Sequence, residues 1–210
     1  MNSFVRGYDW KKHDEDKLAH AFYGVQASAS LETIIKVLDA YDANKDYVIS
    51  ELEHLMNERG IYGNVVESYL RLVPGEQTIA FCVSVTHARG TADSLNAAGI
   101  TAEVLHSGTP PKRRAEIMDD FRKGRIKVLC NCTLLREGLS IDGISCVMML
   151  RPTESVALGI QQQMRCMRYL SGKIAKILDF TGNYLRIGLP DDDREWSLNK
   201  PSVRKRELNE

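Results

Sequence analysis

Residues 144–180 read ISCVMMLRPTESVALGIQQQMRCMRYLSGKIAKILDF and contain, in order, a strand, a helix and a second strand. The two predicted strands, 144–150 and 174–180, are runs dominated by apolar residues, and the predicted helix spans 154–169. Strands without regular polar alternation are typical of a parallel sheet whose two faces are covered by helices. A strand–helix–strand connection of this kind forms a right-handed crossover, so the segment predicts an α/β fold.

The same alternation continues toward the N-terminus. Three more strands are predicted, at 78–85, 101–105 and 126–131. Three more helices are predicted, at 61–73, 87–98 and 109–123, the last capped by Thr109 with Pro110 at its first position. In open parallel sheets ligands bind beyond the carboxyl ends of the strands, so the loops at those ends are candidates for a site.

The chain is expected to have three regions. Residues 61–187 form the α/β domain, 1–60 a helical N-terminal extension, and 188–210 a polar C-terminal tail. Within the extension, helices are predicted at 18–22, 31–38 and 52–59.

The amino-acid composition indicates where a polyanionic partner would bind and in which cellular compartment the cysteines would stay reduced. Lys and Arg number 28, as do Asp and Glu, but residues 61–180 carry 15 basic against 11 acidic side chains, so any site for a polyanion is expected there. No run of about 18 apolar residues is present, which predicts no membrane-spanning helix. The 5 cysteines show no metal-ligand spacing, and buried free thiols in a reducing cytoplasm are expected.

The strongest candidate site lies in QQQMRCMR, residues 161–168. On a helix, Gln161, Arg165 and Arg168 lie at i, i+4 and i+7, so all three are expected on one face near a strand's carboxyl end. Two rigid guanidinium groups on one face suit a polyphosphate. An exposed helix with two solvated arginines explains the spacing equally well.

Two further loops are candidates. In VLCNCTLLREGLS, residues 128–140, a buried strand leads into Glu137 and Gly138, where the backbone can approach a ligand closely. In HSGTPP, residues 106–111, a turn at a helix N-terminus offers a hydroxyl and backbone amides to a phosphate. The alternative for the first loop is an ordinary loop at the end of a strand, and the alternative for the second is a solvent-exposed first turn of a helix.

Taken in order, three segments resemble motifs IV, V and VI of the C-terminal RecA-like domain of superfamily-two helicases, of the DEAD/DEAH-box-like, phage and bacterial DNA-repair type. These segments are TIAFCVSVTHA, VLCNCTLLREGLS and QQQMRCMR. Motif V is similar to that of the bacterial excision-repair helicase subunit, and motif VI usually reads Q-x-x-G-R-x-x-R. The match covers roughly residues 46–198 and implies a RecA-like three-layer sandwich with a mostly parallel sheet.

The resemblance also implies roles for particular residues. Arg165 and Arg168 would be arginine fingers, supported by Gln161, that reach ATP and its magnesium held mainly by a first RecA-like domain. Glu137 and Gly138 would face the nucleotide. The residues expected to touch the nucleic-acid backbone, with DNA expected rather than RNA, are Ser84, Thr133, His106 and Gly108.

The sequence departs from the family pattern in ways that matter. Met164 stands where motif VI usually has glycine, and Ser140 stands where motif V commonly has an aspartate, with Asp142 two residues later. The chain also has no G-x-x-x-x-G-K-[ST] loop and no D-E-x-[DH] box, so it cannot be a complete motor. We expect either half of a helicase motor or, as the alternative, a non-catalytic module that binds nucleic acid or a partner.

Residues 42–53, DANKDYVISELE, resemble an EF-hand calcium loop. Candidate ligands are Asp42, Asn44, Asp46 and Glu53. Against this reading, Tyr47 occupies the position where the sharp turn normally requires glycine, and the chain offers no second hand. We therefore expect no metal site here, with a calcium-binding adaptor as the minor alternative.

Overall fold

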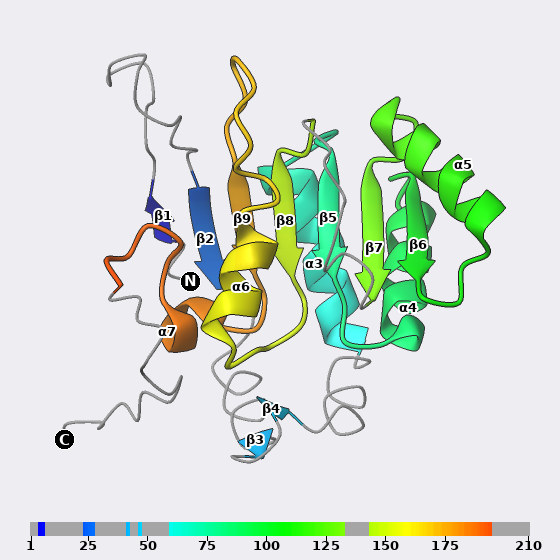
Figure 1. Cartoon of the computed structure of the whole chain (residues 1–210). Coiled ribbons are helices and arrows are strands. Elements are labelled where there is room, and N and C mark those ends of the chain that lie inside the picture. Colours follow the sequence, from blue (N-terminus) through cyan, green and yellow to red (C-terminus); the bar gives the residue numbers. More distant parts are fainter. Residues whose placement is uncertain are drawn as a thin grey trace.

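The computed structural model describes residues 4–6, 23–27, 41–42, 46–47, 59–132 and 143–194. Its main feature is a seven-stranded sheet with the order β1-β2-β9-β8-β5-β7-β6 (Figure 1). The strands are β1 (Phe4–Arg6), β2 (Tyr23–Ala27), β5 (Thr78–Phe81), β6 (Ala102–His106), β7 (Val128–Cys132), β8 (Cys146–Met149) and β9 (Lys176–Asp179). All neighbours pair in parallel except β1, which pairs antiparallel with β2.

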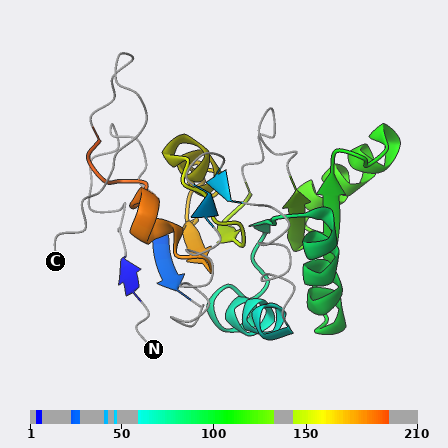
Figure 2. The same cartoon turned by 90° about the horizontal axis from the view of Figure 1, so that it is seen from below.

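Helices cover both faces of the sheet, as the apolar strands predicted (Figure 2). The helices are α3 (Arg59–Leu72), α4 (Val85–Ala97), α5 (Pro111–Arg122), α6 (Val156–Gln163) and α7 (Asn183–Ile187). The predicted three-layer α/β sandwich with a mostly parallel sheet is therefore confirmed.

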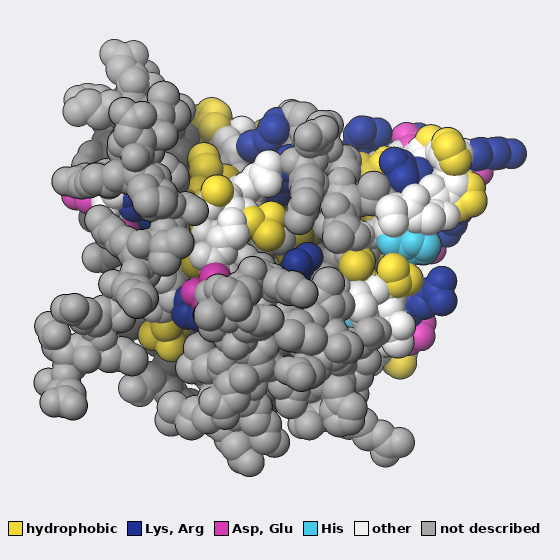
Figure 3. All heavy atoms as spheres, turned by 60° about the horizontal axis from the view of Figure 1, so that its bottom comes forward, with side chains coloured by type: hydrophobic (Ala, Val, Ile, Leu, Met, Phe, Trp, Pro, Cys, Tyr) yellow, Lys and Arg dark blue, Asp and Glu magenta, His cyan; other side chains and the backbone are white. Residues whose placement is uncertain are grey.

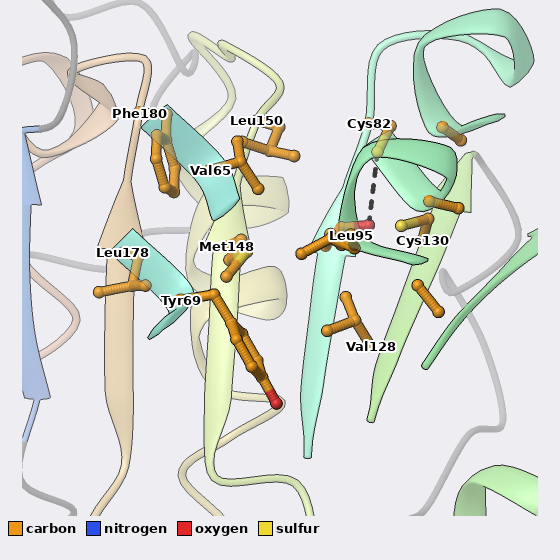
Figure 4. Packing of buried hydrophobic residues seen from close by; sticks show 14 of the residues in the cluster. Val65, Tyr69, Cys82, Leu95, Val128, Cys130, Met148, Leu150, Leu178 and Phe180 are labelled. Carbon is orange, nitrogen blue, oxygen red and sulfur yellow. Dashed lines mark hydrogen bonds between the residues drawn. The ribbon is translucent and has the colours of Figure 1, made fainter. Parts of the chain in front are cut away.

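Two hydrophobic cores, one on each face, hold the layers together. In the first, side chains from α3 and α4 such as Tyr69 and Leu95 pack on Val128 and Met148 of the strands (Figure 4). In the second, α5 contributes Ile117, Met118 and Phe121 to a cluster with strand residues that include Leu129, Val147 and Ile177. Alternate residues of one strand thus enter opposite cores, which is why the strands are apolar throughout.

The elements predicted for residues 61–180 are all present, with shifted ends. The strand predicted at 78–85 stops at Phe81 because Ser84 caps α4, which begins at Val85. Thr109 does not cap α5, which corrects the prediction; Pro110 is the cap residue and makes no side-chain cap hydrogen bond. The 5 cysteines are free and buried, as expected. Within the described ranges no helix is long and apolar enough to cross a membrane.

The first sixty residues contribute strands that the sequence reading missed. β2 pairs in parallel with β9, so it extends the main sheet, and β1 pairs with β2 at the edge. A separate two-stranded ladder joins β3 (Tyr41–Asp42) to β4 (Asp46–Tyr47). The helices predicted at 18–22 and 31–38 lie outside the described residues, as does the helix predicted at 52–59 apart from Arg59, which begins α3.

Candidate functional site

α6 is shorter than predicted, and this changes the geometry of the candidate arginines. Ser155 caps its start, where its Oγ accepts a hydrogen bond from the Leu158 N–H at 3.3 Å, and Met164 caps its end. Gln161 therefore lies on the helix, whereas Arg165 and Arg168 follow it. The prediction that all three share one face of a helix running to residue 169 is wrong.

Burial of Cys166 explains why the chain leaves the helix. Its side chain is completely buried in the second core, and its thiol donates weakly to the carbonyl oxygens of Gln163 at 3.2 Å and Lys176 at 3.6 Å. Lys176 is the first residue of β9, so the contact ties the segment after α6 to the amino end of that strand.

The arginine segment therefore lies toward the amino-terminal edge of β8 and β9. Lys173 reinforces this placement, since its Nζ donates to the carbonyl oxygen of Ile144, just before β8, at 3.0 Å. In Figure 1 the chain leaves α6 upward, away from the arrowheads that mark the carboxyl ends. The expectation that these arginines lie near a strand's carboxyl end is wrong.

Arg165 and Arg168 are nevertheless close enough to influence one another. Burial lowers the pKa of the half-buried Arg165 guanidinium, and the positive charge of the exposed Arg168 lowers it further. Residues 155–178 contain no Asp or Glu. The pair therefore forms a local concentration of positive charge that an anion would relieve.

Methionine at position 164 is compatible with this geometry. Met164 has φ −66°, in the right-handed helical region where any L-residue is unstrained, and its side chain is 55% exposed. The departure from glycine therefore requires no rearrangement of the core.

α7 anchors the loop that leads into α6, a feature that the sequence reading missed. Asn183 is fully buried, and its Oδ1 accepts from the Thr153 N–H at 2.9 Å while its Nδ2 donates to the Arg151 carbonyl oxygen at 3.0 Å. Arg186 donates from Nη2 to the same Oδ1 at 2.7 Å and to the Thr181 carbonyl oxygen at 3.1 Å. One amide thus connects α7 to the loop between β8 and α6.

Charged groups extend this anchor. Arg186 Nε lies 3.1 Å from Glu154 Oε1, which is one residue before the cap of α6. Asp179, at the end of β9, accepts hydrogen bonds from the backbone N–H groups of Thr181 at 3.0 Å and Tyr184 at 2.8 Å. Burial raises the pKa of the Asp179 carboxyl, while these hydrogen bonds oppose the shift.

Gly159 lets α6 approach α7 closely. A Cβ at this position would lie 2.0 Å from Ile187 Cδ1, which is inside any allowed contact. The side chains of Thr153 and Ile187 therefore close around a glycine that carries no side chain of its own. This contact and the Asn183 hydrogen bonds fix the start of α6 against α7.

Ser84, predicted to touch nucleic acid, follows β5 at the carboxyl edge of the sheet. Its Oγ accepts from the backbone N–H of His87 at 3.0 Å, so the hydroxyl oxygen already caps α4. The His87 ring is buried, and its Nδ1 accepts from the Val83 N–H at 3.4 Å. Ser84 is half-buried, so its hydroxyl reaches the surface only in part.

The loop after β6 is closed by its own hydrogen bonds, which corrects the idea that it offers free amides. The Gly108 N–H donates to His106 Nδ1 at 3.1 Å, and the Thr109 N–H donates to the His106 carbonyl oxygen at 2.9 Å. Thr109 Oγ1 accepts from the His106 N–H at 3.1 Å. Pro110 and Pro111 have no N–H, so the amides from 108 to 111 are used or absent.

The carboxyl edge is partly basic. Figure 3, which brings the carboxyl ends of the strands forward, shows Lys and Arg side chains at the side of the molecule where α5 lies. The basic residues of the first turn of α5 are Lys112, Arg113 and Arg114. Arg113 pairs with Glu103 at 2.8 Å, so part of this charge is neutralised.

The predicted site residues therefore divide between two edges of the sheet. Ser84, His106 and Gly108 lie at the carboxyl edge, where β7 separates β5 from β6, and the two arginines lie toward the other edge. Thr133, Glu137 and Gly138 lie outside the described residues, as do Ser140 and Asp142.

The calcium candidates are only partly described. Asp42 and Asp46 face each other across the β3–β4 ladder, and Asn44 and Glu53 lie outside the described residues. Among the described residues no group of three or more His, Cys, Asp or Glu could hold a metal.

This chain is similar to a known protein family, to longer curated proteins and to solved structures. The model of the helicase conserved C-terminal domain matches residues 63–170. A 51.5 kDa protein of a Lactococcus phage (isolate 7-9) is 37% identical over 153 residues, which cover 73% of this chain and 34% of the phage protein. The putative ATP-dependent helicase IRC3 of Saccharomyces cerevisiae is 28% identical over 165 residues, which cover 77% of this chain and 23% of that helicase.

UvrABC system protein B of Bifidobacterium longum is 30% identical over 135 residues, 62% of this chain and 19% of that protein. The chain thus spans about a third or less of these curated relatives. Among solved structures, the C-terminal domain of the DEAD-box protein Dbp5 matches with a TM-score of 0.52 at 24% identity, covering 60% of this chain and 73% of that domain. Saccharomyces cerevisiae Dbp5 bound to RNA and ADP BeF3 also has a TM-score of 0.52 at 24% identity, covering 61% of this chain and 34% of that one. These likenesses show the fold.

Proposed function

The chain belongs to the family of helicase conserved C-terminal domains, and on that premise we propose that it is the second motor domain of an ATP-dependent DNA helicase. The observation that carries the proposal is that two positive charges, those of Arg165 and Arg168, lie close together on a segment without acidic residues. Two adjacent guanidinium groups suit the triphosphate of a nucleotide because each presents a rigid fork of donors.

In this proposal the arginines act on ATP bound by a first RecA-like domain. The substrate would be ATP bound together with magnesium. During its hydrolysis, Arg165 and Arg168 would stabilise the negative charge on the phosphate oxygens of ATP. Gln161, exposed on α6, would support them, and Glu137 and Gly138 would face the nucleotide. The anchor between α7 and the start of α6 keeps the helix that precedes the arginines in place.

The proposal requires a partner domain, because the chain lacks a phosphate-binding loop and a magnesium-binding acidic box. The greater length of the relatives supports a parent protein or partner chain that supplies both. A cytoplasmic setting suits the free, buried thiols.

We assign the nucleic-acid contacts to Ser84, Thr133, His106 and Gly108. The closed loop from His106 to Thr109 holds its shape before binding, which limits the entropy lost on contact with a phosphate backbone. A relative named for the UvrABC system supports DNA, whereas Dbp5 has been captured with RNA. Anisotropy titrations with single-stranded DNA and RNA of one sequence, over a range of salt, decide between the two.

A chimera tests the arginine proposal. This chain replaces the aligned part of the Saccharomyces cerevisiae helicase IRC3, and ATP turnover is measured with and without single-stranded DNA. Arg168→Ala should lower kcat by about 10³-fold, the lower end of what arginine fingers contribute. Arg71→Ala, an exposed arginine on α3 across the sheet, is the matched control. Equal turnover in the two variants would contradict the proposal and would favour the alternative function, a non-catalytic binding module.

A further inference from the structure

The seven-stranded sheet ends at β6, so among the described residues one edge of β6 has no strand beside it. In a parallel strand, alternate residues direct both the backbone N–H and the C=O to the same side. Thr101, just before β6, faces β7, because its carbonyl oxygen accepts from the Val128 N–H at 3.0 Å. By alternation Ala102, Val104 and His106 face the free edge. Such backbone groups form a template on which another strand can add.

The Asn96 side chain occupies the first of these edge positions. Its Nδ2 donates to the Ala102 carbonyl oxygen at 2.9 Å, and its Oδ1 accepts from the Ala102 N–H at 3.0 Å. A carboxamide offers the same donor and acceptor as a peptide group, so the side chain stands where a neighbouring strand would pair. Asn96 lies in the last turn of α4, and that helix holds the amide beside the start of β6.

Thr109 occupies the last edge position in a similar way. Its N–H donates to the His106 carbonyl oxygen at 2.9 Å, and its Oγ1 accepts from the His106 N–H at 3.1 Å. The hydrogen bonds that close the loop after β6 therefore also close the end of the sheet edge. Thr109 does not cap α5, and its hydroxyl instead caps β6. Between the two closed positions, Val104 has outward backbone groups that neither Asn96 nor Thr109 uses.

We propose that Asn96 and Thr109 keep the edge of β6 closed to a second copy of this chain. Two copies of β6 related by a twofold axis at Val104 would pair antiparallel, with Ala102 of one opposite His106 of the other. A fully open edge would form six hydrogen bonds, one for each of the three outward N–H groups of either copy. With both side chains in place only the two bonds at Val104 remain, which are too few to hold two molecules together.

The twofold geometry makes the two side chains act together. Because Ala102 of one copy pairs with His106 of the other, a bond between them needs both positions to be open. Asn96→Ala with Thr109→Val frees both backbone groups of Ala102 and the N–H of His106. This double variant can form four bonds between two copies, whereas either single variant can form only the two at Val104.

Sedimentation equilibrium over a range of protein concentrations measures self-association of the wild type, the single variants and the double variant. Two added hydrogen bonds should make the double variant associate about tenfold or more strongly than either single variant. Asn96→Ala with Thr91→Val is the matched control, because the Thr91 hydroxyl donates to the His87 carbonyl oxygen within α4, at 2.9 Å, and not to β6. Amide hydrogen exchange locates the contact: in the double variant, exchange at residues 102–106 should slow as the protein concentration rises.

A second measurement needs no variant. In the wild type the Val104 amide should exchange about tenfold or more faster than the amides of Ala102 and His106, whose hydrogens are bonded within the chain. Equal protection of the three amides would overturn the proposal, because the middle of the edge would then be covered as well.

The association measurements can overturn the proposal in three ways. A single variant that associates as strongly as the double variant would show that the two side chains do not act together. Equal association of the control pair would show that lost stability, and not an open edge, drives association. A folded double variant that stays as monomeric as the wild type, or that associates without slower exchange at residues 102–106, would show that the edge of β6 is not the surface involved.

Discussion

Replacing Asn183 by alanine tests the anchor that holds α6. The substitution removes the acceptor of the Thr153 N–H, the donor to the Arg151 carbonyl oxygen and one partner of Arg186. Thr153 is fully buried, so water cannot replace its lost partner. An unsatisfied buried group costs about 1–3 kcal/mol, and with the loss at Arg151 we expect a total of about 3 kcal/mol.

Asn96→Ala is the matched control. Asn96 makes a similar pair of backbone hydrogen bonds, from Nδ2 to the Ala102 carbonyl oxygen at 2.9 Å and from the Ala102 N–H to Oδ1 at 3.0 Å. It is exposed, so water can replace these bonds and the cost should be about 1 kcal/mol. Urea unfolding monitored by circular dichroism gives both free energies. Equal costs for the two variants would refute the idea that α7 anchors α6.

Further predictions concern the same region. Gly159→Ala should lower the free energy of unfolding by about 1–3 kcal/mol because its Cβ overlaps Ile187, and a double variant with Ile187→Ala should lose less than the sum of the single effects. The pKa of Asp179 is raised in the folded state, so ionisation of its carboxyl opposes folding. The free energy of unfolding of the wild type relative to Asp179→Asn should therefore fall as the pH rises from about 3.8 through the folded-state pKa of Asp179. Urea unfolding from pH 4 to 7 should show this decrease, and a difference that stays constant with pH would contradict it. Arg168→Ala relieves repulsion of Arg165, so at low salt its melting temperature should equal or exceed that of the wild type; a clear decrease in calorimetry would mean that Arg168 serves stability.

The positions of strands β5 to β9 could be predicted from the sequence, whereas the end of α6 could not. The difference is that local residues determine the strands, whereas a tertiary contact determines where the helix ends. An apolar strand is recognisable locally because both of its faces are buried. Residues 164–169 contain good helix formers, so local preference extends the helix, whereas burial of Cys166 against β9 ends it. That contact joins Cys166 to a strand residue ten positions later, and the spacing of the arginines cannot reveal it.

The anchor and the N-terminal strands were missed for a related reason. Asn183 and Thr153 are 30 residues apart, and nothing in either neighbourhood marks them as partners. β2 is a short segment, YGVQA, with a glycine inside, and its pairing with β9 spans most of the chain. Polar networks and edge strands of this kind depend on tertiary contacts, which composition and periodicity do not encode.

ATP turnover by three proteins tests the central claim most directly: the isolated chain, the IRC3 chimera, and that chimera with Arg168→Ala, each with single-stranded DNA. The account predicts hydrolysis by the unmodified chimera alone, since the chain contributes Arg165 and Arg168 but no phosphate-binding loop. DNA-stimulated hydrolysis by the isolated chain would contradict it, because the chain would then hold a complete nucleotide site of its own.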